Sequence, residues 1–297
     1  MLVNKPNLQS LFTGFNTKFN AAFEAAPSQF RLVSMEAPSA AREETYAWLG
    51  QFARMREWIG QRNIRNLSLH SYTLKNKTFE DTVSIPRTDI EDDKFGIFNP
   101  VVSEMGRSAA MHPDELIFAL LSSGFDALCY DGQPFFDADH PRIQADGTEV
   151  SVSNMQAGAE TPWFLLDCSR EIKPTIWQPR MPYEFQMQTD LGETNVFMND
   201  EFRYGVRARA NAGFGFWQMA FGSKATLDAA NYEAARSAIA SLKGDNDRPL
   251  ALSGTHLVVP PSLEGAARKL VVNTVNTAGA SNEWAGSAEL IVSPWLA

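Results

Sequence analysis

Chemically versatile residues are concentrated in one short stretch, Cys129 to Pro141, with the sequence CYDGQPFFDADHP. It contains a thiol, three carboxylates and an imidazole. Cys129 and His140 are of the types that serve as nucleophile and base, and with the aspartates they could bind a metal ion. The same stretch contains Asp131-Gly132 and His140-Pro141, which are turn signals. Three interpretations therefore compete: a nucleophile with its base, a metal site, and a pair of turns.

The surrounding sequence favours the turns. Cys129 comes after the predicted helix and Leu128, at a half-buried position where a thiol is usually inert. The acidic residues lack the spacing of an EF-hand calcium loop, which also needs a Glu at its twelfth position. Two linked turns anchored by Phe135-Phe136 account for the whole stretch. A hydrolase that uses Cys129 and His140, assisted by Asp137, is the alternative.

Four further sequence signatures of catalysis or ligand binding are missing from the chain. Gly222-Ser223-Lys224 lacks the glycine spacing of a phosphate-binding loop, and Gly213-Phe214-Gly215 does not extend to a dinucleotide fingerprint. There is no zinc-protease His pair and no Gly-x-Ser-x-Gly elbow. Adjacent side chains diverge, so Glu91-Asp92-Asp93 is expected to be a solvated loop. We expect no catalytic residue, no cofactor and no metal.

Composition limits the class of protein and its partners. At 297 residues, 44% of them hydrophobic, the chain can bury a large core. A formal net charge of −9 argues against a general nucleic-acid binder, although it permits a local basic strip. Two cysteines fit a reducing compartment. No apolar run reaches the roughly 18 residues that span a membrane.

Three arginines are the candidate basic strip. Arg203, Arg207 and Arg209 are spaced by two or four residues, so on a strand they share a face. There they could contact DNA, pair with carboxylates of a neighbouring subunit, or remain solvated.

The N-terminal segment predicts an amphipathic helix that ends at Pro27. Its apolar residues recur at steps of three and four: Leu8, Leu11, Phe12, Phe15, Phe19 and Phe23. Its polar face carries mainly Asn, Ser, Gln and Thr, which argues against membrane binding. We expect the helix to dock on the chain's own core or on a neighbouring subunit.

Residues Gln61 to Arg87 predict a hairpin of two strands, with Lys75-Asn76-Lys77 as its polar turn. Tyr72, Leu74 and Phe79 are among its alternating apolar positions. With about ten residues per strand the hairpin is roughly 33 Å long, and a two-stranded hairpin is marginally stable by itself. We expect it to lie against the body of the chain or against another copy.

A long helix is predicted from Pro100 to Ser123, about 36 Å if its two halves are collinear. Asn99 is the expected cap and Pro100 the first helical residue. Pro113 is expected to interrupt the helix and restart it, which places Asp114 in a first turn where a carboxylate suits the helix dipole. From Thr226 onward, alternating helices and strands predict a compact α/β portion.

Several long segments follow one another along nearly the whole chain: APSQF (26–30), TYAWLGQF (45–52), REWIG (56–60), NKTFEDTV (76–83), EMGRSAAMHPDELIF (104–118), CYDGQPFFDADHP (129–141), LLDCSREIKP (165–174), FRYGVRARANAGFGFWQMA (202–220) and THLVVPPSLEGAARKL (255–270). Together they resemble the major head subunit of Mu-like tailed phages. Long segments spread in this way are far more specific than a short site signature.

The resemblance implies an α+β fold of the Hong Kong 97-like capsid class. It assigns residues 1–45 to an N-terminal arm and 46–98 to an extended hairpin loop with its flanks. Residues 99–222 become a peripheral domain with a long spine helix and a strand-rich region. Residues 223–297 become a C-terminal α/β portion that contributes to the axial domain. The stretch 129–141 is then the turn that leaves the spine helix.

The implied function is that of a major capsid protein, not an enzyme, which self-assembles into hexamers and pentamers of an icosahedral head around double-stranded DNA. A minor head or tail protein is the alternative. The implied partners are copies of the chain itself, a scaffolding protein, a maturation protease, a portal and a decoration protein, with DNA bound non-specifically and no membrane. The protein would reside in the virion, and in the host cytoplasm during assembly.

The residues expected to contact neighbouring subunits come from the arm, the loop and the arginine strip: Leu8, Leu11, Phe12, Phe15, Phe19, Tyr72, Leu74, Lys75, Lys77, Phe79, Arg203, Arg207 and Arg209. Some capsids of this fold crosslink neighbouring loops through a Lys–Asn isopeptide bond. Lys75 and Lys77 lie at the predicted loop tip. The sequence does not identify the carboxylate that would activate either lysine, so it leaves crosslinking undecided, and we do not expect it.

Overall fold

The computed structural model describes residues 2–49, 72–92, 94–275 and 279–296, and all structural statements below concern these residues. The helices are α1 (Lys5–Ala25), α2 (Phe30–Val33), α3 (Arg87–Glu91), α4 (Asn99–Ser123), α5 (Thr194–Asn199), α6 (Ala229–Ser241) and α7 (Glu264–Ala267). The strands are β1 (Ser34–Glu36), β2 (Glu43–Tyr46), β3 (Tyr72–Lys75), β4 (Lys77–Pro86), β5 (His140–Ile143), β6 (Glu149–Val152), β7 (Met155–Gln156), β8 (Trp163–Leu166), β9 (Thr175–Gln188), β10 (Glu201–Phe214), β11 (Ala220–Ser223), β12 (His256–Val259) and β13 (Glu289–Val292).

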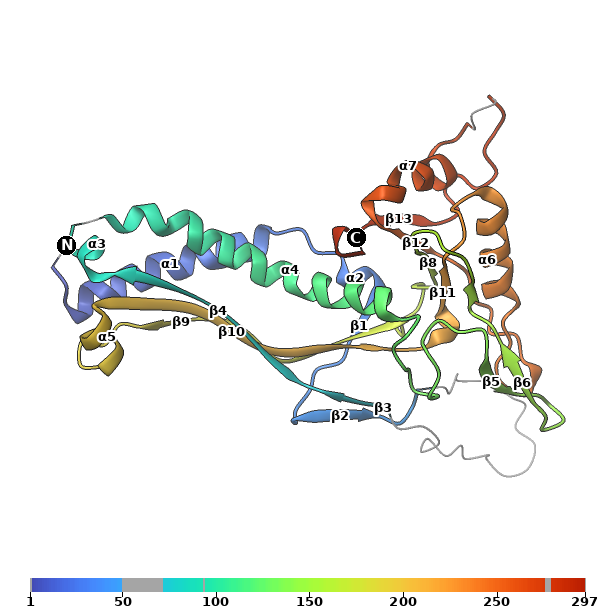
Figure 1. Cartoon of the computed structure of the whole chain (residues 1–297), viewed down its shortest axis with the longest axis horizontal. Coiled ribbons are helices and arrows are strands. Elements are labelled where there is room, and N and C mark those ends of the chain that lie inside the picture. Colours follow the sequence, from blue (N-terminus) through green and yellow to red (C-terminus); the bar gives the residue numbers. More distant parts are fainter. Residues whose placement is uncertain (1, 50–71, 93, 276–278, 297) are drawn as a thin grey trace.

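These elements form an elongated lobe and a compact lobe (Figure 1). The elongated lobe consists of α1 and α4 on one face of a sheet with the strand order β1-β9-β10-β4. The compact lobe is built on a second sheet, ordered β13-β12-β8-β11-β7, flanked by α6 and α7. Helices and strands are thus combined in the α+β manner predicted. Among the described helices, none has both the length and the apolar character needed to cross a bilayer.

The sheet of the elongated lobe is covered on one side by the helices. Along β10 buried and more exposed residues alternate, as they do in a strand with one face on a core. Phe202, Tyr204 and Val206 are buried in the same apolar cluster as the residues of α1 and α4. Arg203 and Arg207 occupy the alternate positions and therefore face the opposite side of the sheet.

The N-terminal helix α1 begins at a capped end and packs along α4. The side chain of Asn4 accepts a hydrogen bond from the Asn7 backbone amide at 2.9 Å. Phe15 makes an edge contact with Tyr204, and Phe19 stacks on Phe185, each with ring centroids 5.1 Å apart. A Cβ atom at Gly106 of α4 would lie 2.3 Å from the carbonyl oxygen of Phe19, so the two backbones approach this closely only because residue 106 is glycine.

The long helix predicted around Pro113 is confirmed, but the restart is wrong. Helix α4 runs for 25 residues with Pro113 inside it, and Phe98 rather than Asn99 is its N-cap. Asp114 therefore lies in the middle of a helix. Its Oδ1 accepts hydrogen bonds from the backbone amides of Gln29 and Phe30 at 2.9 and 2.6 Å, so it ties the start of α2 to α4.

The hairpin predicted across Lys75-Asn76-Lys77 is also wrong in the described part. β4 pairs with β10, whereas β3 pairs with β2. Asn76 is buried between them, and its amide donates to Ser39 Oγ at 2.8 Å and accepts from Gln178 at 2.9 Å. Because its side-chain amide is buried and hydrogen-bonded, Asn76 holds the chain where it passes from the β2–β3 sheet to the sheet that contains β4. It is therefore not the exposed tip of a loop. The remaining predicted hairpin residues, 61–71, lie outside the described residues.

The sheet of the compact lobe is buried on both faces at its centre. All four residues of β8 are buried, as are all four of β11. The strands and helix predicted near the C-terminus are present, and β12 and β13 pair in parallel with α7 between them in sequence. Asp228 caps the N-terminus of helix α6, and its side chain accepts from the Asn231 amide at 2.8 Å.

The long strands β9 and β10 take part in the cores of both lobes, and their pairing has two consecutive register shifts between Arg207 and Ala210. Arg207 is opposite Glu184, Arg209 opposite Met181, and Ala210 opposite Pro179. The register shifts leave Pro182 of β9 without a partner in β10. Because proline has no amide hydrogen to donate to a sheet, it fits such a bulge.

Candidate functional site

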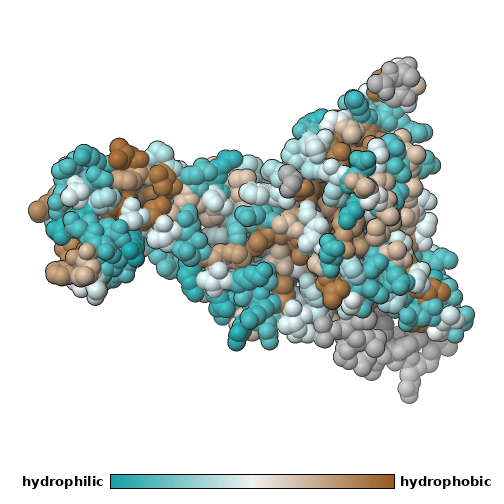
Figure 2. All heavy atoms as spheres, viewed as in Figure 1, coloured by the Kyte–Doolittle hydropathy of each residue, from teal (hydrophilic) through white to brown (hydrophobic). Residues whose placement is uncertain are grey.

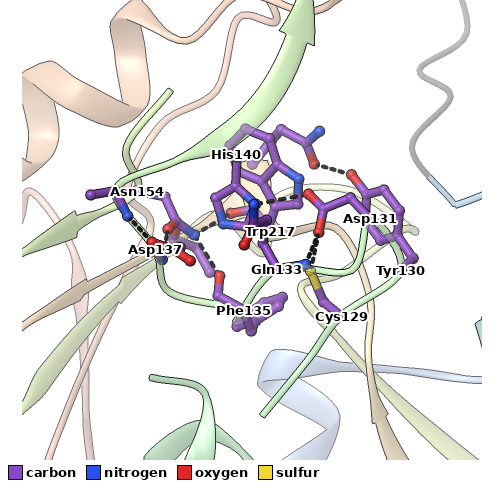
Figure 3. A network of polar contacts seen from close by, with 12 residues as sticks. Cys129, Tyr130, Asp131, Gln133, Phe135, Asp137, His140, Asn154 and Trp217 are labelled. Atoms are coloured by element: carbon purple, nitrogen blue, oxygen red, sulfur yellow. Dashed lines mark hydrogen bonds and ion pairs between the residues drawn. The ribbon is translucent and has the colours of Figure 1, made fainter. Parts of the chain in front are cut away.

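The chemically versatile stretch folds into a compact turn after the end of α4 (Figure 3). The Cys129 amide donates to the Gln133 carbonyl at 2.8 Å, and Gly132 between them has a φ of 87°, a conformation that glycine adopts without strain. The Gln133 amide donates in turn to Asp131 Oδ1 at 3.1 Å. The predicted Asp-Gly turn is therefore present.

Within this turn Asp131 joins the thiol to the imidazole. Cys129 Sγ donates to Asp131 Oδ1 at 3.0 Å, and His140 Nδ1 lies 2.8 Å from Asp131 Oδ2. The His140 ring is fully buried and stacks on Trp217, with centroids 3.9 Å apart and the rings 6° from parallel. The side chain of Asp137, the assistant in the hydrolase alternative, instead accepts from its neighbour Ala138.

The electrostatics of this cluster oppose nucleophilic catalysis. Burial raises the pKa of the Cys129 thiol, and the Asp131 carboxylate raises it further, so the thiol is protonated at neutral pH. Burial alone would raise the pKa of Asp131, but hydrogen bonds from His140 and Cys129 outweigh burial and hold it below its usual range. The imidazole and the thiol thus both act on the carboxylate, and the structure does not support the hydrolase.

Asn154 connects this turn to the compact lobe, which the sequence alone did not indicate. Its side-chain amide donates to the Phe135 carbonyl at 2.8 Å, and its Oδ1 accepts from the Asp137 amide at 2.9 Å. It is fully buried. The stretch Gln144–Glu160 is rich in Ser, Gly, Asp and Asn, and no pattern in it marks Asn154 as buried.

The three candidate arginines share the open face of the elongated lobe's sheet, as predicted. Arg207 lies between Glu80 of β4 and Glu184 of β9 in the register of the sheet, and Arg203 donates to Glu201 at 2.7 Å. Arg203 and Arg207 also line a shallow hollow of about 370 Å³ on this face. Positive charges interleaved with carboxylates suit a protein surface of mixed charge better than a row of phosphates.

The apolar candidates for subunit contacts are placed mainly inside the chain. Leu8, Leu11, Phe15, Phe19 and Leu74 are buried. Phe12 stacks on Phe185 with centroids 5.6 Å apart, Phe79 contacts the ring of His112, and the Tyr72 hydroxyl accepts from the Phe214 amide. Lys75 and Lys77 are exposed. In this conformation α1 thus docks on the chain's own core, one of the two expected positions.

Exposed apolar side chains gather instead at the outer end of the elongated lobe (Figure 2). Phe197 and Met198 of α5 are 81% and 71% exposed, and Leu2 and Ile97 are 75% and 64% exposed. Figure 1 places the N-terminus, α3 and α5 together at this end. The sequence contains the apolar run Val-Phe-Met in α5, but only the fold shows which of these side chains is uncovered.

Comparisons with known proteins cover nearly the whole chain. The family model of the Mu-like prophage major head subunit gpT matches residues 8–296. This chain belongs to that family. It is 42% identical to the major capsid protein of Escherichia phage Mu over the full length of both. It is 44% identical to the Mu-like prophage FluMu major head subunit of Haemophilus influenzae, over 89% of this chain and 88% of the relative.

Solved structures agree with this membership. The subunit of the bacteriophage JBD30 procapsid matches with a TM-score of 0.88 and 43% identity, covering 99% of this chain and 100% of the other. The subunit of the JBD30 capsid matches with a TM-score of 0.78 and 32% identity over the full length of both. The gpT-family chain therefore has the Hong Kong 97-like capsid fold, and the family is one of structural proteins rather than enzymes.

Proposed function

We propose that copies of this chain form the hexamers and pentamers of an icosahedral phage head that encloses double-stranded DNA. The observation that carries this proposal is the full-length match to the Mu major capsid protein, together with the match of the whole fold to a procapsid subunit. A minor head or tail protein is less well supported, because the relatives that match over the whole length are major head subunits.

Two surfaces of the described chain suit contacts between subunits. The outer end of the elongated lobe exposes Phe197 and Met198, and burying apolar side chains of this size is the main source of association energy. The open sheet face presents Arg207 beside Glu80 and Glu184, a mixed pattern that can fix the register of a neighbour. Lys75, Lys77, Arg203 and Arg209 stay candidates for the same contacts.

Further partners follow from the family. A JBD30 capsid whose subunit matches this chain with a TM-score of 0.79 is decorated with minor capsid protein trimers, which supports a decoration protein here. A scaffolding protein, a maturation protease and a portal are the other expected partners, and the packaged DNA would be held without sequence preference. The chain resides in the virion, and we place its assembly in the host cytoplasm.

Expression of the chain in bacteria, with negative-stain electron microscopy of the soluble fraction, tests the proposal. Closed shells, tubes or hexameric rings are expected, either from the chain alone or when the phage's scaffolding protein is co-expressed. A monomer under both conditions would overturn it. Phe197→Ser should reduce assembly at the apolar end while Phe197→Leu, which keeps an apolar side chain, should not. Equal assembly by both variants would show that this end of the lobe does not contribute to the interface.

A further inference from the structure

Three residues with potential ligand atoms meet in the turn that follows α4. Cys129, Asp131 and His140 each place a ligand atom within 4.8 Å of the others. Asp131 directs Oδ1 toward the Cys129 sulfur at 3.0 Å and Oδ2 toward His140 Nδ1 at 2.8 Å. Sulfur, nitrogen and a carboxylate oxygen are thereby gathered around one small volume. They are three of the four donors of a tetrahedral site, and water takes the fourth position in zinc sites that have three protein ligands.

We propose that Cys129, Asp131 and His140 bind one divalent transition-metal ion of the zinc class. Thiolate, imidazole and carboxylate are all zinc ligands, with bonds of about 2.0–2.3 Å. A thiolate, a carboxylate, a neutral imidazole and a doubly charged cation sum to zero charge. Neutrality matters because a net charge in so buried a site would be costly.

Metal binding replaces two hydrogen bonds that now converge on the carboxylate. An ionised carboxylate only accepts, so Asp131 takes hydrogen bonds from the Cys129 thiol and from His140 Nδ1. When the ion binds, the thiol loses its proton to solvent, and the imidazole proton moves from Nδ1 to Nε2. One proton is therefore released per ion bound, and no redox change occurs.

The surroundings hold the three ligand residues in place. The face of the His140 ring is fixed by Trp217 at 3.9 Å, and the turn around Gly132 fixes Cys129 relative to Asp131. His140 Nε2 is buried and, among the described residues, has no hydrogen-bond partner. Binding through Nδ1 places the proton on Nε2, so the metal bonds must offset the cost of one buried donor that has no acceptor among these residues.

Such an ion would fasten the end of α4 to the start of β5. Cys129 and Asp131 lie in the turn after α4, which ends at Ser123, whereas His140 is the first residue of β5, in a hairpin beside the compact lobe. Because His140 is fully buried, we expect the ion to be acquired as the chain folds and to exchange slowly afterwards. The inference rests on this geometry and does not depend on the proposed capsid function.

The first test is the zinc content of the intact chain. The protein is expressed in zinc-supplemented medium, dialysed against a weak chelator that removes surface ions, and analysed by plasma mass spectrometry. One zinc ion per chain is expected for the wild type and less than a tenth of that for Cys129→Ser. Serine can keep the hydrogen bond to Asp131 but is a poor metal ligand. Cys168→Ser, at the other buried cysteine, should retain the full content.

Two results would overturn the proposal. One is a wild-type chain that contains no zinc, and the other is zinc content that is equal in the wild type and Cys129→Ser, which would mark the ion as bound elsewhere. Should Cys129→Ser fail to fold, the wild type grown with Co²⁺ in place of zinc gives a second readout. A thiolate-to-cobalt charge-transfer band is expected at a ratio of one per chain, and its absence from folded protein would also overturn the proposal.

Discussion

The sheets of the two lobes differ in how many of their faces are buried. In the compact lobe β8 and β11 are buried along their whole length, with side chains packed on both faces. In the elongated lobe β10 is buried on alternate residues only, because α1 and α4 cover a single face. The first arrangement is complete within one chain, whereas the second leaves a polar sheet face and an apolar end uncovered.

The difference shows which parts of the molecule are fully buried within one chain and which leave a face open to a partner. A continuous apolar run such as Trp163–Leu166 has no side left for a partner, so changes there act on the stability of the chain. In a strand with alternating burial, side chains on one face pack on the core and stabilise the fold, and those on the other face can contact a partner. Substitutions in β10 should therefore separate folding from assembly, and those in β8 should not.

The largest expected effect is in the compact lobe. Phe164→Ala removes a fully buried ring that stacks on Phe136 at 5.2 Å, and it should lower the free energy of unfolding by about 3–5 kcal/mol. Arg207→Ala on the open sheet face should change it by no more than about 0.5 kcal/mol. Urea titration of the unassembled chain measures both, and similar losses for the two variants would contradict the contrast between the lobes.

The contact between α1 and α4 should be the next most sensitive place. Gly106→Ala puts a Cβ atom 2.3 Å from the Phe19 carbonyl oxygen, so the helices must separate, at a cost of about 1–3 kcal/mol or more. Gly14→Ala is the matched control, because a Cβ atom there meets nothing within 4 Å. It should stabilise α1 by about 0.5–1 kcal/mol. Thermal unfolding that ranks the two variants in the opposite order would refute this packing.

Asp114 should contribute a comparable but smaller amount to the free energy of unfolding. Asp114→Ala leaves the amides of Gln29 and Phe30 without their acceptor, which should cost about 1–3 kcal/mol and expose residues 26–33 to proteases. Asp114→Asn keeps one acceptor oxygen and should lose less. Limited proteolysis followed by mass spectrometry locates the cleavage. Resistance of this segment in Asp114→Ala would show that Asp114 does not hold it.

The smallest expected effect is the pH dependence of stability that His112 causes in the elongated lobe. Burial lowers the pKa of His112 below its ordinary value of 6.5, with the Glu115 carboxylate opposing the shift. The unfolded chain then takes up a proton before the folded chain does, so stability is fully present above pH 6.5 and decreases as the pH falls. The slope from this residue is at most about 1.4 kcal/mol per pH unit. In His112→Gln it should vanish, and an unchanged slope between pH 6.5 and 5 would exclude His112.

Local patterns in the sequence predicted the elements with strong periodicity. The Leu and Phe stripe of α1, the length of α4 and the shared face of the three arginines all depend on spacing within one element, and all are present. The position of the Cys129 turn was also predicted, because Asp131-Gly132 is a local signal.

The errors arose where a local signal has two structural outcomes. Asp114 after Pro113 looks the same in a helix that restarts and in one that continues, and its partners Gln29 and Phe30 lie far away in sequence. Lys75-Asn76-Lys77 has the composition of a turn, yet Asn76 is buried by contacts to Ser39 and Gln178. The contact of His140 with Asp131 rather than with Cys129 likewise depends on packing against Trp217.

The bulge around Pro182 has a mechanical consequence. Because β9 and β10 contribute residues to the cores of both lobes, a load applied to one lobe is carried along two continuous strands to the other. The ladder between these chains is weakest where Pro179 and Pro182 supply no amide hydrogen. We therefore expect any bending or twisting between the two lobes to occur at this bulge.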